Sequence, residues 1–316
     1  MHTPLESDLE VGPPSETTVD AAASPKPKLK QSYERSPEVQ RWLQEHAVER
    51  DGVKPEFDPQ FLANRRDRDW ILSSLAHFYH EDLIADVLHQ VSSGKEATVY
   101  CCRADPATGA DLLAAKVYRP RIFRSLSNDA VYRQSRVQRD MDGRIMRGGR
   151  TRGAPGQSKR GRTAQINSWI TFEFETQQLL HAAGADVPRV WSHIGNAVLM
   201  DYVGAVDDPA PRLQDVELDP AEAQPLFDTL LRNVELCLAC NRIHGDLSAY
   251  NILYWDGSVT LIDFAQALDP RHNPEVFGML HRDIDRVYRY FAPYAVEADP
   301  VGIATDLWSR YLRGRL

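Results

Sequence analysis

One predicted β-hairpin constrains the fold of this chain more than any other feature. The Asp256-Gly257 pair stands between two apolar runs, residues 252–254 and 259–262. Asp-Gly between alternating apolar residues is a strong local signal for a hairpin with a two-residue turn. Because a hairpin folds its two ends back together, we expect Asn251 and Asp263, which flank it, to be neighbours in space.

The polar residues at this hairpin are of the kinds that phosphoryl transfer requires. Asp246, in a His-Gly-Asp sequence, could accept a proton from a hydroxyl nucleophile. Asn251 and Asp263 could bind one Mg²⁺ ion, which takes oxygen ligands and keeps waters and substrate phosphates in its coordination shell. The alternative is a chance turn before an ordinary hairpin, but three spaced residues and the hairpin agree on a phosphotransferase.

The order of these residues is similar to the protein-kinase signature, in which a catalytic Asp precedes an Asn and an Asp-Phe pair follows. Small-molecule phosphotransferases of the aminoglycoside and choline kinase type also carry His-Gly-Asp and Ile-Asp-Phe. The stretch therefore predicts phosphoryl transfer and leaves the acceptor open.

A turn of small residues is predicted after a strand over residues 84–91. Its backbone N–H groups, hydroxyls and ammonium group could cover phosphates. It is not a Walker loop, because Gly-Lys is followed by Glu and a strand and no upstream Gly is present. A plain hairpin turn is the alternative. The turn consists of Ser92, Ser93, Gly94 and Lys95.

Lys116 lies in an otherwise apolar predicted strand, residues 112–118. A Lys in such a strand is commonly an edge residue, but after a phosphate-covering turn it is a candidate to pair with the α- and β-phosphates. Its carboxylate partner should come from the next helix, expected over residues 169–181. We predict Glu173, with Glu175 as second choice and solvated helix glutamates as the alternative for both.

Further elements frame these segments. Residues 197–204 are predicted to form a buried strand, which in a kinase would be the hinge whose backbone meets adenine. Apolar residues at helical spacing predict helices over residues 67–80, 226–241 and 277–291, and the second would lead into the loop of Asp246.

Composition indicates a globular, reduced and cytoplasmic protein that does not span a membrane. Hydrophobic residues make up 42% and aromatic residues 9% of the chain, and no apolar run approaches the ~20 residues that a bilayer requires. The N-terminus lacks a basic region followed by an apolar one, so no secretory signal is expected. Cys237 and Cys240 fall in a helical apolar pattern without a second zinc-type pair, which predicts core cysteines.

The net charge of −8 is unevenly distributed. Residues 133–162, the basic segment, carry nine Arg and one Lys against two Asp, so their local charge is +8 and the remainder sums to −16. The basic segment lies in a flexible loop expected over about residues 125–167, and it could contact nucleic-acid phosphates or be a solvated loop. Residues 1–66 are expected to be a disordered tail and linker with one short helix.

Four blocks of sequence resemble the RIO family of atypical serine kinases, and a bacterial member in particular. The resemblance covers about residues 83–291, and its serine-containing turn separates this family from the small-molecule kinases. The blocks are Ser-Ser-Gly-Lys-Glu-Ala-Thr-Val-Tyr, Ala-Lys-Val-Tyr, His-Gly-Asp-Leu-Ser-x-Tyr-Asn and Ile-Asp-Phe-x-Gln.

The resemblance implies an α+β, two-lobed protein-kinase-like fold without an activation loop or peptide-docking subdomains. The N-lobe would be β-rich and span residues 67–203, and the helical C-lobe would span residues 204–316. Two departures from the family pattern occur, since Ala249 replaces the usual Glu and Ala265 replaces the Gly expected after Asp-Phe.

Roles for individual residues also follow from the resemblance. Asp246 would be the catalytic residue, assisted by Lys116 and by Ser248 beside the phosphates, and Asn251 and Asp263 would bind Mg²⁺. ATP would be contacted by Ser92, Ser93, Gly94, Lys95, Val99, Lys116, Glu173, Met200, Asp201 and Val203.

The implied function is an ATP- and Mg²⁺-dependent serine/threonine protein kinase that phosphorylates itself or a protein substrate, or hydrolyses ATP. Two alternatives stay open. One is a nucleotide-gated ribosome-assembly or RNA-binding factor that contacts ribosomal RNA or particles through the basic segment. The other is a small-molecule phosphotransferase of the aminoglycoside or choline kinase type.

Overall fold

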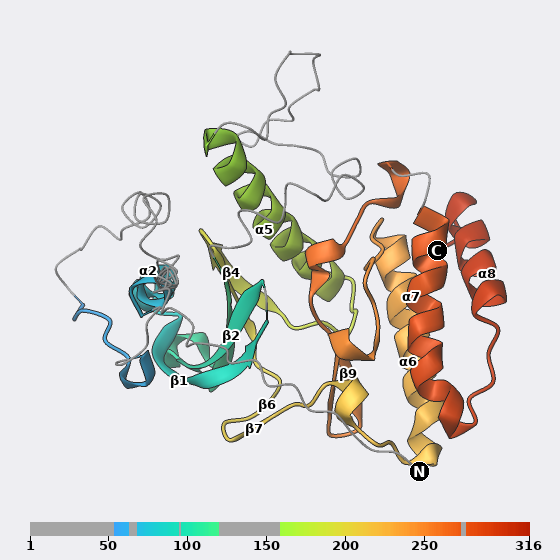
Figure 1. Ribbon diagram of the computed structural model, residues 1–316, viewed down its shortest axis with the longest axis horizontal. Helices are drawn as coiled ribbons and strands as arrows, with labels where there is room; N and C mark the ends of the chain where they lie inside the picture. Colours follow the sequence, from blue (N-terminus) through green and yellow to red (C-terminus); the bar gives the residue numbers. More distant parts are fainter. Residues whose placement is uncertain (1–53, 63–67, 95, 120–158, 273–275) are drawn as a thin grey trace, which may run out of the picture. The chain divides into compact units, whose positions relative to one another are not determined.

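The computed structural model describes residues 54–62, 68–94, 96–119, 159–272 and 276–316, with the backbone alone for residues 159–169 and 272. These residues form a two-lobed α+β fold with a β-rich N-lobe and a helical C-lobe (Figure 1). The predicted fold class is therefore confirmed.

The N-lobe is built on a five-stranded antiparallel sheet with strand order β1-β2-β3-β5-β4. One helix precedes the sheet in the chain, and a long helix connects β3 to β4 (Figure 1). The elements are α2 (Arg68–His80), β1 (Ile84–Ser93), β2 (Ala97–Ala104), β3 (Leu112–Tyr118), α5 (Lys159–Ala182), β4 (Val190–Ile194) and β5 (Ala197–Asp201).

The two faces of this sheet have different neighbours because side chains alternate along a strand. Leu113, Ala115 and Val117 of β3 are buried in one cluster with apolar residues of α2. The intervening residues of β3 face the opposite side, and there Tyr118 packs with Ile170 of α5. Lys116 has the same parity as Tyr118, so β3 presents its one Lys to α5 and the C-lobe.

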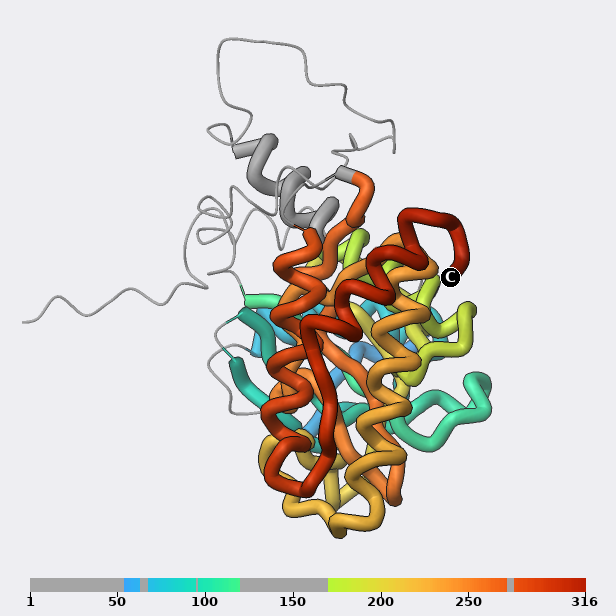
Figure 2. The backbone as a smooth tube through the Cα atoms, turned by 90° about the vertical axis from the view of Figure 1, so that its right-hand side faces the viewer, coloured from blue at the N-terminus to red at the C-terminus, as the bar shows by residue number. Residues whose placement is uncertain are grey.

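The C-lobe packs three helices against one another, and the predicted β-hairpin contacts one of them, α6. Figure 2 shows the helices side by side, and their contacts bury the largest apolar cluster of the described residues. Two of them begin with an Asp-Pro pair in which the Asp side chain accepts from a backbone N–H of the first turn. The elements are α6 (Pro220–Ala239), β8 (Ile252–Trp255), β9 (Ser258–Leu261), α7 (Val276–Phe291) and α8 (Pro300–Leu312).

Short elements complete the fold. A two-residue strand pair, β6 (Gly204–Ala205) with β7 (Asp208–Pro209), follows the hinge. Between Asp263 and α7, the described residues form two 3-10 turns, η6 (Phe264–Gln266) and η7 (Pro270–His272), where larger kinases place an activation loop.

Most predicted elements are present, and two helices differ at their starts. The hairpin pairs Ile252 with Leu261 and Trp255 with Ser258 across the Asp256-Gly257 turn, as expected. Helix α5 begins at Lys159, ten residues before the predicted start at residue 169. Helix α6 begins at Pro220 rather than at residue 226.

The physical reasons for these two differences are local. The first residues of α5 include Lys159, Arg160, Gly161 and Arg162 and lack the apolar spacing that marks a buried helix face, so they favoured a loop. Pro225 lies inside α6, and proline disfavours a helix interior. The sequence therefore predicted that the helix begins after Pro225 rather than at Pro220.

Several expectations concern residues that the structure does not describe. The tail with its short helix (residues 1–53), Lys95 and residues 120–158 of the basic loop lie outside the described ranges. Within those ranges, no helix is both long enough and apolar enough to cross a membrane.

Candidate active site

Three charged side chains meet where the two lobes face each other. Lys116 Nζ of β3 lies 2.7 Å from Glu173 Oε1 of α5 and 2.8 Å from Asp263 Oδ1 at the end of the hairpin. Burial alone would lower the pKa of Lys116, but Asp263 and Glu173 outweigh it and raise that pKa well above its usual range. Lys116 therefore carries its charge, and its attraction lowers the pKa of Asp263.

Tyr118 is a second partner of Glu173, which the sequence had not indicated. Its hydroxyl donates to Glu173 Oε2, and both side chains are buried. Burial first, and then the charge of Glu173, raise the pKa of Tyr118 well above its ordinary value, so the phenol stays protonated. Glu173 is thus held from both carboxylate oxygens, whereas Glu175, the second choice, is exposed.

The strand register places predicted nucleotide contacts on the same face as Lys116. Val99 of β2 lies opposite Lys116, and Met200 of β5 lies opposite Ala114. Val99, Ala114 and Met200 belong to a small apolar cluster that also contains Ala265, next to the Asp-Phe pair. An adenine base requires such an apolar surface beside polar phosphate contacts.

The small-residue turn connects β1 to β2 as predicted. Ser92 and Ser93 still pair with β2, and the Gly94 N–H donates to the carbonyl of Ala97 at 2.9 Å. Arg119, directly after β3, donates to Ser93 Oγ and to Thr98 Oγ1 at 3.0 Å. The sequence analysis missed this guanidinium, although its position after an apolar strand beside a serine turn could have suggested it.

The predicted hinge residues Asp201 and Val203 each accept a hydrogen bond from another segment. Asp201 accepts from the indole N–H of Trp191 at 2.7 Å. The carbonyl of Val203 accepts from the Ala210 N–H at 3.1 Å. These bonds tie the segment to β4 and to the residue after β7.

The hairpin brings the two predicted metal ligands together. The N–H of Ile262, the residue before Asp263, donates to the carbonyl of Asn251 at 3.0 Å. The Asn251 amide group donates to the carbonyl of Asp246 at 2.8 Å, which leaves its own oxygen available to a cation. Asn251 and Asp263 therefore lie at the same end of the hairpin, and each carries a side-chain oxygen of the kind that Mg²⁺ binds.

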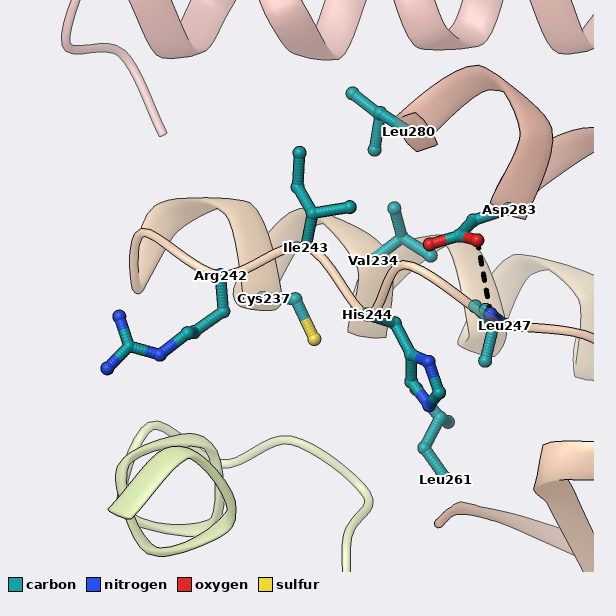
Figure 3. Close-up of a pocket in the computed structure, with 9 residues that line it drawn as sticks. All are labelled: Val234, Cys237, Arg242, Ile243, His244, Leu247, Leu261, Leu280 and Asp283. Carbon is teal, nitrogen blue, oxygen red and sulfur yellow. Dashed lines mark hydrogen bonds between the residues drawn. The ribbon is translucent and has the colours of Figure 1, made fainter. Parts of the chain in front are cut away.

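Asp283 of α7 lies beside the loop that carries Asp246, as Figure 3 shows for its contact with Leu247. Its carboxylate accepts from the N–H of Gly245 at 2.7 Å and from that of Leu247 at 3.1 Å. Burial raises the pKa of Asp283 to about 7, against the opposing effect of these two bonds. Gly245 has φ +80°, and a Cβ there would lie 2.5 Å from the carbonyl of Gln266, so the loop requires glycine here.

His244 connects the loop to the hairpin. Burial lowers its pKa, so the ring is neutral and its Nε2–H donates to the carbonyl of Ile262 at 3.1 Å. Its ring also packs against Phe264 with centroids 4.8 Å apart. The loop residues on either side of Asp246 are thus anchored by α7 and by the hairpin.

Asp246 itself is engaged by an Arg that the sequence analysis did not single out. Arg286 Nη1 of α7 lies 2.7 Å from Asp246 Oδ1, and the side chains are 40% and 51% exposed. Ser248 precedes the short turn η5 (Ala249–Asn251), and its carbonyl accepts from the Asn251 N–H at 2.9 Å. Asp246 and Ser248 both line a groove of about 960 Å³ on the C-lobe.

The cysteines do not form a metal site in the part of the chain that the structure describes. All four are free thiols, with Cys237 buried and Cys240 half-buried. The described residues contain no group of three or more His, Cys, Asp or Glu side chains that could hold a metal ion. The interpretation of Cys237 as a core residue agrees with its burial, which raises its pKa to about 12.

A comparison with known proteins identifies the family. The RIO domain matches residues 114–301, which is more than half of the chain. This match includes Lys116, Glu173, Asp246, Asn251 and Asp263.

Relatives in archaea and eukaryotes are similar over much of the same region. The chain is 29% identical over 209 residues to the RIO-type serine/threonine-protein kinase Rio1 of Haloferax volcanii, covering 66% of this chain and 64% of the relative. It is 29% identical over 208 residues to the serine/threonine-protein kinase RIO1 of Caenorhabditis elegans, covering 65% and 37%. A Rio1 kinase of Thermoplasma acidophilum is 33% identical over 132 residues, covering 42% and 68%. The chain thus spans less than two thirds of the first two relatives.

A solved structure shares the fold at low sequence identity. The Rio2 kinase–ADP/Mg²⁺–phosphoaspartate complex from Chaetomium thermophilum aligns with a TM-score of 0.54 at 18% identity, covering 76% of this chain and 65% of that one. With the domain match, the archaeal and eukaryotic relatives and the two-lobed architecture in agreement, the chain belongs to the RIO family.

Proposed function

We propose that the chain is an ATP- and Mg²⁺-dependent serine/threonine protein kinase of RIO type. The observation that carries this proposal is the contact of Lys116 with both Glu173 and Asp263. Asp263 follows Asp246 and Asn251 closely in the sequence, and the last two are joined by a hydrogen bond. Kinases need this pairing of a strand Lys with a helix Glu, together with an Asp that binds the metal. The names of the relatives, all protein kinases, support it.

Nucleotide and metal would be held by residues from both lobes. Bound Mg²⁺ would neutralise charge on the phosphates, and Asn251 and Asp263 supply the oxygen ligands. Lys116 would pair with the α- and β-phosphates, in an orientation that Glu173 fixes. The turn of Ser92, Ser93, Gly94 and Lys95 would cover the phosphates, while Val99 and residues Met200, Asp201 and Val203 would contact the base.

The chemical step transfers the γ-phosphoryl group to an acceptor hydroxyl, and ADP leaves. The bond between the γ-phosphorus and its bridging oxygen breaks, and a bond from the serine oxygen forms. Asp246 accepts the hydroxyl proton, and Ser248 lies next to it in the groove. Arg286 contacts one carboxylate oxygen of Asp246, Oδ1, so an acceptor hydroxyl either displaces this contact or binds the second oxygen.

Labelled ATP and purified protein test this proposal, with autophosphorylation and free phosphate measured separately. Asp263→Ala should abolish Mg²⁺-dependent turnover, and Asp246→Ala should lower it by roughly 10²–10⁴-fold, the range for a lost general base. Nucleotide binding should survive in Asp246→Ala, since that side chain meets the acceptor. Asp228→Ala, which removes an exposed carboxylate from α6, is the matched control. Wild-type turnover by Asp246→Ala would show that the catalytic residue is misassigned.

We also propose a second activity for the basic segment, namely contact with RNA such as ribosomal RNA. Its local charge of +8 in an acidic chain is the observation that favours it.

The small-molecule phosphotransferase alternative receives no support from the relatives. The four free cysteines support a reducing, cytoplasmic location.

A further inference from the structure

A groove on the C-lobe meets the catalytic loop at Asp246 and Asn251. Its volume is about 960 Å³, and all of its lining residues lie after the hinge in the sequence, so it is separate from the sheet that carries Lys116. An acceptor hydroxyl must approach Asp246 within hydrogen-bond distance. The groove is the open surface along which the rest of the acceptor would then lie.

The charges in the groove are arranged on two walls. Helix α7 contributes Arg286 and Arg289, one turn apart, and the segment before α6 contributes Asp215 and Glu217. Arg289 is paired with Asp285 at 2.8 Å and is 74% exposed. Arg286 is paired with Asp246 itself, so the proposed catalytic carboxylate holds the cation next to the reacting position.

We propose that this groove binds the acceptor as a polypeptide segment, and that Arg286 selects an acidic side chain close to the acceptor serine. The inference rests on the proposed kinase function and specifies its substrate class. An Asp or Glu of the substrate takes over the Arg286 guanidinium and releases Asp246 toward the serine hydroxyl. Arg286 is thus a specificity-determining residue that acts on the acceptor and, through Asp246, on the reaction.

Two physical features make this exchange possible. The Arg286–Asp246 pair is half-exposed on both sides, and such pairs are weak because water screens them. A second carboxylate can therefore replace the first, and the planar guanidinium fork matches it in two hydrogen bonds. Since extended chain advances about 3.3–3.6 Å per residue, an acidic residue one or two positions from the serine lies within reach of Arg286.

The remaining lining residues favour a peptide over a polyanion. Asp215, Glu217 and Asp246 would repel successive phosphates of an RNA strand, whereas one acidic side chain need only approach the α7 wall. Tyr250 is 55% exposed in the same groove and offers an aromatic face to a peptide. The groove as a whole therefore matches a serine segment with a single acidic neighbour.

Peptide binding tests the inference without requiring turnover. Serine peptides with Glu at one of the two positions on either side, and matched peptides with Gln, are titrated by fluorescence anisotropy into the full chain with Mg²⁺ and a non-hydrolysable ATP analogue. In at least one register the Glu peptide should bind about fivefold more tightly than its Gln twin, the scale of a half-exposed ion pair. Arg286→Ala should abolish this preference, and Arg286→Glu should reverse it, so that the Gln peptide binds more tightly than its Glu twin.

Arg313→Ala, which removes an exposed guanidinium after α8, is the matched control and should keep the preference. Thermal unfolding of each variant verifies that it is folded. Equal affinity of Glu and Gln peptides in every register, absence of peptide binding, or a preference that survives in Arg286→Ala would overturn the inference. Displacement of the Glu peptide by single-stranded RNA would also overturn it. The proposed kinase function is judged separately, by ATP turnover of the wild-type protein, so failure of one leaves the other testable.

Discussion

Replacing Asp283 by Asn should change how the stability of this protein depends on pH. Asp283 is 2% exposed, and burial raises its pKa from 3.8 to about 7. The native carboxyl therefore keeps its proton to a higher pH than the carboxyl of the unfolded chain. Between these two values the native state binds more protons, so raising the pH favours unfolding.

The size of the effect follows from the two pKa values. A carboxyl with a pKa of about 7 in the folded state and 3.8 in the unfolded state contributes about 4 kcal/mol across the whole range. Most of the loss occurs between the two values, and about 2–3 kcal/mol of it lies between pH 5 and pH 8. This contribution is present at low pH and is lost as the pH rises through about 7.

Urea unfolding at a series of pH values measures the effect, with wild type and Asp283→Asn compared at each pH so that other titrating groups cancel. The wild-type free energy of unfolding should fall relative to the variant by about 2–3 kcal/mol from pH 5 to pH 8. A constant offset is expected in addition, because an amide offers one acceptor to the N–H groups of Gly245 and Leu247. Parallel pH curves for the two proteins would refute the reasoning, since they would mean that Asp283 ionises at its ordinary pKa.

Tyr118→Phe should lower the free energy of unfolding by about 1–3 kcal/mol, because a buried carboxylate oxygen of Glu173 loses its donor. Tyr118→Phe should also weaken ATP turnover. The control, Tyr250→Phe on the surface, should leave stability unchanged in the same urea titration. Equal stability of the wild type and both variants would contradict this role for Tyr118. If the basic segment binds RNA, affinity in salt titrations should fall with a log–log slope of about −0.7 per contact on single strands. A variant with four substitutions should flatten this slope, whereas an unchanged slope would favour a solvated loop. The four substitutions are Arg144→Ala, Arg147→Ala, Arg150→Ala and Arg152→Ala.

The parts of the site that the sequence predicted depend on local signals. The Asp-Gly turn and its flanking apolar runs were enough to bring Asn251 and Asp263 together, because hairpin geometry is set by neighbouring residues. The fold class and the order of the lobes were implied by the resemblance of four sequence blocks to the RIO family. The chemical roles of Asn251 and Asp263 remain predictions.

The residues that the sequence analysis missed depend on contacts between distant elements. Arg286 lies on α7, whose apolar spacing predicts a buried face but not which of its polar side chains reaches Asp246. Tyr118 looked like one more apolar strand residue, and its hydroxyl gained a role only when α5 placed Glu173 beside it. Such pairings depend on how helices pack, which composition and periodicity do not determine.

The β8–β9 hairpin acts as a spacer with a closed base and a solvent-exposed turn. The bond from the Ile262 N–H to Asn251 closes the base, and the turn at Asp256-Gly257 lies four paired positions away. Extra residues at the tip would extend the ribbon without moving the two oxygen donors. A single residue inserted into one strand would instead reverse the side-chain alternation and turn one donor away from the other. Length variation in this region is therefore compatible with an intact site only when it enters through the turn.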